Sequence, residues 1–285
     1  MARLRAEVDA LTPDRKAQLA ARRKLLTGRV RDAKRPKPPT ALAERYAGAL
    51  RAVNRVLVAE VKKALVPWLK EVKGERNDAA INFRALLIRL NRIAADMGAR
   101  TSENFAEAIA RGNLAEMSAI LKIDLAAEPA RVLRLLESWR AENVDLITSI
   151  AKRLHSDVRR IVAEVTRTGE RVESVSRRLA ERYAVSESRA NLIARDQVLK
   201  ANSDLTRVRA TEAGITRYRW STSKDERVRG KPGGKNPNGL HFALEGQIFA
   251  WNDPPIAGLD GSRAHPGQDY QCRCIAIPVL GGELE

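Results

Sequence analysis

The residue types that can bind a transition metal gather near the C-terminal end of this chain. Both cysteines and two of the three histidines lie in its last fifth, namely His241, His265, Cys272 and Cys274. Thiolate sulfur and imidazole nitrogen are donors that zinc prefers, and four of them complete a tetrahedral site. These four residues are the first candidate metal site. We expect no cofactor, and zinc at these four residues is the alternative.

The spacing of the two cysteines supports an alternative without metal. Zinc fingers usually separate paired cysteines by roughly two to four residues, whereas Cys272 and Cys274 are separated by one. In a β-strand such a pair points to opposite faces, so both thiols reach one metal only if the chain bulges or turns at Arg273. In the alternative, one cysteine packs in the core, and His265 and Asp225 tie loops together by hydrogen bonds.

A hydrolytic centre is a third interpretation of the same segment. Asp225, His241, Asp253, His265 and Asp269 would supply a metal-dependent nuclease with ligands and a base. However, the sequence lacks the paired histidines of a nuclease hairpin, and it shows no context for a serine or cysteine nucleophile. The glycine-rich stretch 229–239 also lacks the Gly-Lys-Ser/Thr ending of a phosphate-binding loop. We therefore expect that the protein is not an enzyme.

The last third of the chain carries an ordered set of short motifs. The order is Ala194-Arg195-Asp196-Gln197, Ala201-Asn202, Tyr218-Arg219-Trp220, Lys224-Asp225-Glu226-Arg227, His241, Leu244-Glu245-Gly246, Asp253-Pro254-Pro255, His265-Pro266 and Cys272-Arg273-Cys274. In this order the motifs resemble the C-terminal domain of the phage Mu F-like minor head proteins, the phage head morphogenesis family. Many relatives carry a cysteine pair where this chain reads Val228-Arg229-Gly230-Lys231, so a zinc site here would lack those two ligands.

The resemblance implies a function in the assembly of a phage head. Proteins of this family are minor head proteins that act in procapsid assembly, associate with the portal vertex and are present in few copies inside the head. We therefore expect a virion protein of a tailed phage or prophage, made in the cytoplasm of a bacterial host, with the portal protein and other head proteins as partners. A metal-dependent hydrolase and a nucleic-acid-binding module unrelated to virions stay open as alternatives.

Helices are predicted to fill most of the chain ahead of these motifs. Apolar residues recur at spacings of three and four over 40–67, 83–97 and, most regularly, 147–165. The first of these helices is expected to begin at Thr40 and to kink or stop at Pro67. Two more are predicted over 170–183 and 186–212, with Ser186 as the N-cap of the second and Gly214 just past its end.

The strand candidates lie in the C-terminal segment, at 218–222, 247–251 and 274–279. The predicted fold class is therefore α+β, with a mainly helical N-terminal two-thirds followed by a small mixed α+β domain. The predicted boundaries are a basic N-terminal arm and proline-rich linker over 1–40, a helical domain over 41–165 and the Mu F-like domain over 166–285. On the helix over 186–212, Arg195 and Asn202 project from the same side. We expect them to form a structural polar cluster with Asp225 and His265 that pins this helix to the C-terminal loops.

The charge of the chain indicates a polyanionic partner. The net charge is +17, and residues 1–40 hold twelve Lys or Arg against four Asp or Glu. No helix-turn-helix or finger presents a reading surface, so contact with double-stranded DNA is expected to be non-specific. The candidate contacts are Arg22, Arg23, Lys24, Arg29, Arg31, Lys34 and Arg35. No membrane partner is expected, because no apolar run approaches the roughly 20 residues of a span.

Overall fold

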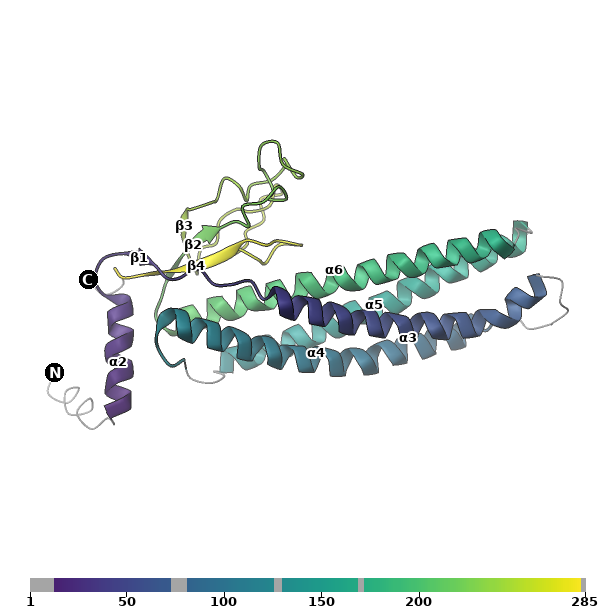
Figure 1. Cartoon of the computed structure of the whole chain (residues 1–285), viewed down its shortest axis with the longest axis horizontal. Helices are drawn as coiled ribbons and strands as arrows, with labels where there is room; N and C mark the ends of the chain where they lie inside the picture. Colours follow the sequence, from purple (N-terminus) through teal and green to yellow (C-terminus); the bar gives the residue numbers. More distant parts are fainter. Residues whose placement is uncertain (1–12, 73–80, 126–129, 169–171, 283–285) are drawn as a thin grey trace. The chain divides into compact units, whose positions relative to one another are not determined.

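The computed structural model describes residues 13–72, 81–125, 130–168 and 172–282. Its helices are α2 (Pro13–Leu26), α3 (Thr40–Val72), α4 (Phe83–Leu121), α5 (Ala130–Thr168) and α6 (Val172–Glu212), and its strands are β1 (Arg31–Asp32), β2 (Arg217–Ser221), β3 (Ile248–Ala250) and β4 (Ile275–Leu280). Helices come first and the strands of the sheet mostly follow (Figure 1). The predicted α+β fold class is confirmed. None of the described helices combines the length and apolarity needed to cross a membrane.

The chain forms two compact units, each built from segments that are distant in sequence. The bundle unit comprises Thr40–Ala108 and Leu136–Val198. The sheet unit comprises the residues up to Pro39, Ile109–Leu135 and the residues from Leu199 onward. Helices α4, α5 and α6 therefore contribute residues to both units. The division of the chain at residues 40 and 165 stays a prediction.

The bundle unit consists of α3 and parts of α4, α5 and α6, which run side by side (Figure 1). The apolar stripe predicted over 147–165 is a buried face of α5, because Ile147, Ile150, Leu154, Val158, Ile161 and Val165 are all buried. Side chains at spacings of three and four share one helix face, so this stripe packs as a continuous ridge. Burial of apolar surface from water is what holds the helices together.

Two details of the bundle differ from the sequence-based expectation. Helix α3 continues through Pro67 to Val72, so the proline does not stop it. The buried side chains Leu65 and Trp68 flank Pro67 and offset its cost of about 3 kcal/mol. Residues 172–212 form one helix rather than two. Ser186 caps nothing there, because it is buried within α6 and donates its hydroxyl to Asn54 on α3.

The sheet unit contains a four-stranded antiparallel sheet in the order β1-β4-β2-β3. Strands β2, β3 and β4 match the three predicted strands. Strand β1 was not predicted, and it pairs Arg31 with Leu280 and Asp32 with Val279 at the edge of the sheet. The segment read from sequence as an arm and linker therefore supplies an edge strand.

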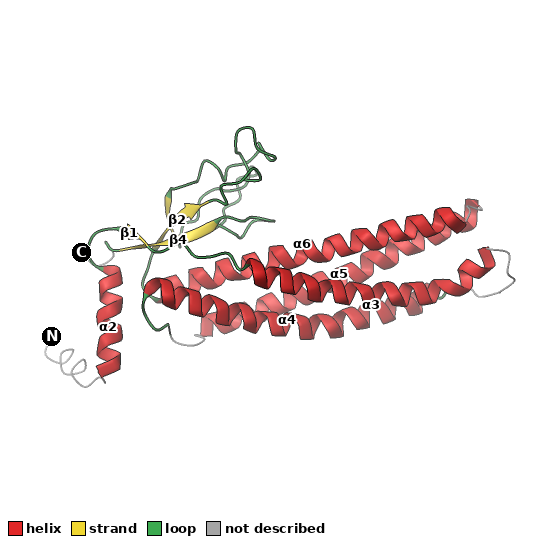
Figure 2. Cartoon of the chain, in the orientation of Figure 1, coloured by secondary structure: helices red, strands yellow, loops and turns green. Residues whose placement is uncertain are grey.

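The sheet packs on a core drawn from every segment of its unit. Tyr218 and Trp220 of β2 are fully buried at its centre, with Leu25 of α2 and Ile215 buried in the same cluster. Most of the chain between β2 and β4 has no regular secondary structure (Figure 2). These irregular loops carry the histidines and cysteines, so side-chain contacts have to hold them in place.

Candidate functional site

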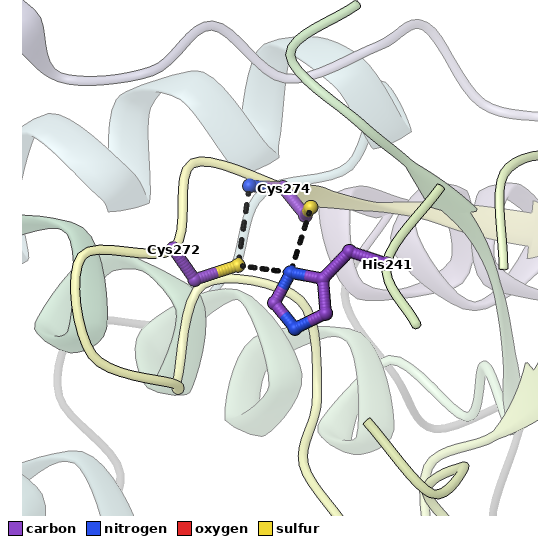
Figure 3. A group of neighbouring side chains, drawn as sticks. All are labelled: His241, Cys272 and Cys274. Atoms are coloured by element: carbon purple, nitrogen blue, oxygen red, sulfur yellow. Dashed lines mark hydrogen bonds between the residues drawn. The ribbon is translucent and has the colours of Figure 1, made fainter. Parts of the chain in front are cut away.

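Three of the four predicted metal ligands meet in the loops beside the sheet. His241 comes from the turns that follow the glycine-rich stretch, and Cys272 and Cys274 precede β4 (Figure 3). All three side chains are buried, with 3%, 5% and 8% of their surface exposed. Their nearest donor atoms all lie within 4.8 Å of one another.

The two cysteines face the same side because they lie outside the strand. Strand β4 begins only at Ile275, and Gln271 just ahead of the pair has a left-handed φ of 54°. The alternation that separates the side chains of a strand therefore does not apply. The chain turns ahead of the strand, which is the condition under which the sequence allowed both thiols to reach one point.

A single nitrogen of His241 faces both sulfur atoms. Nδ1 lies 3.6 Å from Cys272 Sγ and 3.7 Å from Cys274 Sγ (Figure 3). On the other side of the ring, Nε2 lies 3.4 Å from Oδ2 of Asp269 without forming a hydrogen bond. The imidazole therefore stands between a pair of thiols and a carboxylate.

Cys272 is surrounded by groups that stabilise its thiolate. The backbone N–H groups of Gly267 and Cys274 both donate to its sulfur, each at 3.4 Å. The hydrogen bond from the Cys274 side chain, with smaller contributions from His241, lowers the pKa of the Cys272 thiol well below its ordinary value, despite burial. The same hydrogen bond, together with burial, raises the pKa of Cys274. These contacts favour the thiolate at Cys272 over the thiolate at Cys274.

Arg273, between the two cysteines, fixes the turn from outside. Its guanidinium donates two hydrogen bonds to Asp225, with Nη1 at 2.5 Å from Oδ2 and Nη2 at 2.7 Å from Oδ1. Asp225 Oδ1 also accepts the backbone N–H of Arg227 at 2.9 Å. The Arg273 hydrogen bond is the main reason that the pKa of Asp225 is lowered. This forked contact is geometrically specific, and it joins the Lys224–Arg227 motif to the Cys-Arg-Cys motif.

His265, the fourth predicted ligand, lies apart from the His–Cys cluster. Its Nδ1 is 3.0 Å from the hydroxyl of Tyr218, and its ring packs against those of Tyr218 and Trp251. Burial, with a smaller contribution from the positive charge of Arg207, lowers the pKa of His265 to about 4. The imidazole is therefore neutral at physiological pH and bridges a loop to β2.

Three members of the predicted polar cluster of Arg195, Asn202, Asp225 and His265 make separate contacts, and the part of Arg195 in the cluster stays a prediction. Arg195 belongs to the bundle unit, whereas the other three belong to the sheet unit. The side chain of Asn202 accepts a hydrogen bond from Asn113 of α4, at 3.0 Å. Asp225 is held by Arg273 and His265 by Tyr218, as described above.

Two residues missed by the sequence analysis tie helix α6 to the loops. Ser203 donates its hydroxyl to the carbonyl of Pro266 at 2.5 Å, and Asp204 accepts from the side chain of Gln268 at 2.6 Å. Both stand directly after Asn202, on the helix predicted to perform this task. Their type gave no signal, because serine and aspartate on a helix surface usually face water.

The carboxylates proposed for a hydrolytic centre are all bound to arginines. Asp225 pairs with Arg273, Asp253 pairs with Arg263 through a 2.6 Å contact, and Asp269 pairs with Arg229. A carboxylate whose oxygens are held by a guanidinium is less available to take a proton from an attacking water. In the described loops, these carboxylates act as ties between segments.

The basic residues predicted to contact DNA lie on α2, on β1 and in the segments that flank β1. Arg22 is half-buried, and the other six are exposed. Arg31 donates to backbone carbonyls of Lys24 and Arg29, and Arg35 donates to the carbonyl of Thr222 at 3.0 Å. None of the seven forms an ion pair with a carboxylate among the described residues, so their charges remain available to an external anion.

Comparisons with known proteins place the candidate site inside a known domain. Residues 156–277 match the family model described as Phage Mu protein F like protein. The chain is also 32% identical, over 251 residues, to an uncharacterized protein of Haemophilus influenzae (strain ATCC 51907 / DSM 11121 / KW20 / Rd). That alignment covers 82% of this chain and 52% of the relative, so the chain spans about half the relative's length. No solved structure matches the chain. The resemblance drawn from the motifs is confirmed over residues 156–277, which match the phage Mu F-like family.

Proposed function

We propose that this chain is a minor head protein of a tailed phage or prophage, which acts in procapsid assembly at the portal vertex and contacts packaged DNA. The observation that carries the proposal is the match of residues 156–277 to the phage Mu F-like family. The matched region contains the loops that carry His241, Cys272 and Cys274, and the first half of β4. The family is one of structural head proteins, and the site described above is built accordingly from contacts that hold loops together.

Electrostatics support the contact with DNA. A net charge of +17 attracts phosphate from a distance, and six of the seven candidate DNA contacts in the N-terminal segment are exposed. The described residues present no finger or recognition helix that would read base edges. The contact is therefore directed at the DNA backbone, and its strength depends on counterion release rather than on sequence.

Fractionation of virions tests the proposed location. Phage particles from an induced lysogen, or from a plasmid-complemented deletion strain, are separated into DNA-filled heads, empty heads and soluble protein. The chain is expected to remain with the portal protein in purified heads, at few copies per head. Its absence from every head fraction would contradict the proposal.

Deletion and complementation test whether the protein acts in assembly. Loss of the gene is expected to leave heads that are misassembled or fail to fill with DNA, and the wild-type gene in trans is expected to restore them. A deletion strain that produces normal, filled and infectious particles would exclude a function in head assembly. A nuclease or wall-cleaving activity of the purified chain would instead favour the hydrolase alternative.

A further inference from the structure

We propose that His241, Cys272 and Cys274 bind a zinc ion through His241 Nδ1 and the two sulfur atoms. The proposal rests on the geometry of the described residues and is independent of the function in head assembly. The first argument is the convergence of both sulfurs on one nitrogen, at 3.6 and 3.7 Å. An imidazole nitrogen has one lone pair and accepts one good hydrogen bond. A thiol–imidazole hydrogen bond explains one short approach, whereas a shared metal explains both.

The two nitrogen–sulfur distances agree with tetrahedral coordination of a zinc ion. Zinc binds sulfur at about 2.3 Å and histidine nitrogen at about 2.0–2.1 Å, so a tetrahedral angle places nitrogen and sulfur about 3.6 Å apart. The two observed separations lie within about 0.1 Å of that value. The third separation, between the two sulfur atoms, is within 4.8 Å, whereas tetrahedral zinc–sulfur bonds of about 2.3 Å place two sulfurs about 3.8 Å apart, so binding is expected to draw the two cysteine side chains together.

The donor set selects the metal. Two thiolates and an imidazole are soft or borderline ligands, which suit zinc and do not suit magnesium or calcium. Among the described residues, these three form a group of potential ligand side chains close enough to share an ion. The fourth position of a tetrahedral zinc is left to water or to a donor from another molecule, because His265 is held by Tyr218 instead.

The surroundings of the three residues match those of a metal ligand set. Asp269 stands behind the His241 ring, 3.4 Å from Nε2, where a carboxylate commonly orients a metal-bound histidine. His241 Nε2 is buried and has no hydrogen-bond partner in the structure. Metal bound at Nδ1 places the ring proton on Nε2, facing the carboxylate. Two backbone N–H groups also stabilise the sulfur of Cys272 as a thiolate.

Zinc binding by the reduced full-length chain tests the proposal directly. Elemental analysis after purification and exposure to ZnCl₂ is expected to find about one zinc per chain. Because the chain contains two cysteines in all, thiol titration reports on this site alone. Zinc is expected to protect both thiols from a mercurial reagent, and the reagent is expected to release the metal as it reacts. Cobalt is expected to give thiolate-to-metal charge-transfer bands.

Matched variants separate the ligands from the other histidines. Cys272→Ser, Cys274→Ser and His241→Gln are each expected to lose most of the zinc. His155→Gln and His265→Gln are expected to retain it, because His155 bonds to the carbonyl of Phe83 and His265 bonds to Tyr218. Retention of zinc by the three ligand variants, or its loss only in the controls, would assign the metal to another place.

Wild-type measurements keep the proposal falsifiable if a ligand variant fails to fold. A folded, reduced wild-type chain that binds no zinc and gives no cobalt charge-transfer band overturns the proposal. So does a chain isolated under reducing conditions with a Cys272–Cys274 disulfide, seen by mass spectrometry as the loss of two hydrogens. In both cases the thiols would serve packing or redox chemistry instead.

The carboxylate behind the ring provides a second, graded test. Asp269→Asn is expected to weaken zinc binding about 10–100-fold, as the loss of an outer-shell partner usually does. Arg229→Gln is the control, because it breaks the same Arg229–Asp269 ion pair but leaves the carboxylate near His241. Equal zinc affinity in the Asp269→Asn and wild-type chains would show that Asp269 does not orient the ligand.

Discussion

At the scale of single residues, burial and one hydrogen bond to Tyr218 make His265 a structural contact between a loop and β2. Its pKa is lowered to about 4 in the folded protein, chiefly by burial, whereas an unperturbed histidine has a pKa of about 6.5. At a pH between about 4 and about 6.5, His265 is protonated in the unfolded chain and neutral in the folded chain. The stability that neutral His265 contributes is therefore fully present above about pH 6.5 and is lost as the pH falls towards 4.

This linkage predicts a pH-dependent effect of His265→Ala. At pH 7 the substitution is expected to lower the free energy of unfolding by about 1–3 kcal/mol, because the buried hydroxyl of Tyr218 loses its partner. At pH 5 the difference from wild type is expected to shrink, since the wild type has by then lost part of the same contribution. Urea denaturation at both pH values, followed by tryptophan fluorescence, measures this. An equal difference at pH 7 and pH 5 would show that His265 does not titrate as described.

The sequence could predict which residue types form the candidate site, but not which histidine lies beside the two cysteines. The sequence named His241, His265, Cys272 and Cys274 as equivalent candidates, and nothing local distinguishes the two histidines. The distinction comes from the left-handed turn at Gln271 and from contacts between residues 31 and 33 positions apart. Such contacts depend on how the loops fold together, and periodicity carries no information about them.

At the scale of secondary-structure elements, the long apolar stripe of α5 and strands β2, β3 and β4 were predicted, whereas the two-residue strand β1 and the continuity of α6 were not. The apolar stripe over 147–165 is a buried helix face because side chains three and four residues apart must share a side. The two-residue strand β1 has no period to detect. Ser186 looked like an N-cap, yet its hydroxyl bonds to Asn54 on another helix. A serine gives the same local signal in both cases, and only tertiary packing decides between them.

A buried polar network joins helices α3, α5 and α6 of the bundle, and a substitution can test what it contributes. Tyr46 of α3 donates to Asn143 of α5 at 2.8 Å, and Asn143 in turn donates to Gln197 of α6 at 3.1 Å. Burial raises the pKa of Tyr46 to about 12, so its hydroxyl stays protonated and donates. Every member of such a network depends on the others, because an unsatisfied polar group in an apolar interior is costly.

Asn143→Ala is therefore expected to destabilise the bundle by roughly 2–6 kcal/mol. The estimate counts about 1–3 kcal/mol for each of the two partners left unsatisfied. Tyr46→Phe is the control, since it removes one donor and leaves Asn143 bound to Gln197, and it is expected to cost less. Chemical denaturation followed by circular dichroism measures both variants. If Asn143→Ala costs no more than Tyr46→Phe, the network does not hold the three helices together.

At the scale of the whole molecule, the dominant feature is positive charge. Among the described residues, no helix or finger is arranged to contact the base edges of DNA. The net charge of +17 is spread over both units, but the seven candidate DNA contacts in the N-terminal segment are mostly exposed and form no ion pair with a described carboxylate. Leu25 and Ala33 of this segment are buried in the sheet unit. Removing the segment would therefore disturb the fold as well as the charge, and neutralising single side chains is the cleaner experiment.

Neutralisation of four exposed basic residues is expected to weaken DNA binding and to reduce its dependence on salt. The changes are Arg23→Gln, Lys24→Gln, Arg29→Gln and Lys34→Gln, at side chains that are all exposed. Each phosphate contact contributes about 0.9 to the slope of log K against log salt concentration, so loss of four contacts should reduce the slope by about 3–4. Fluorescence anisotropy with two duplexes of unrelated sequence, over a series of NaCl concentrations, measures the slope.

A charge-matched control in the bundle decides whether the contact is local. The control neutralises four exposed residues of the bundle unit, namely Lys63, Arg89, Lys152 and Arg159. It lowers the net charge by the same amount, so it reproduces the weaker long-range attraction without removing the proposed contacts. The slope for the control is expected to stay close to that of the wild type. Equal loss of slope in both variants would mean that DNA meets the whole positive surface, and a strong preference for one duplex would contradict backbone-directed binding.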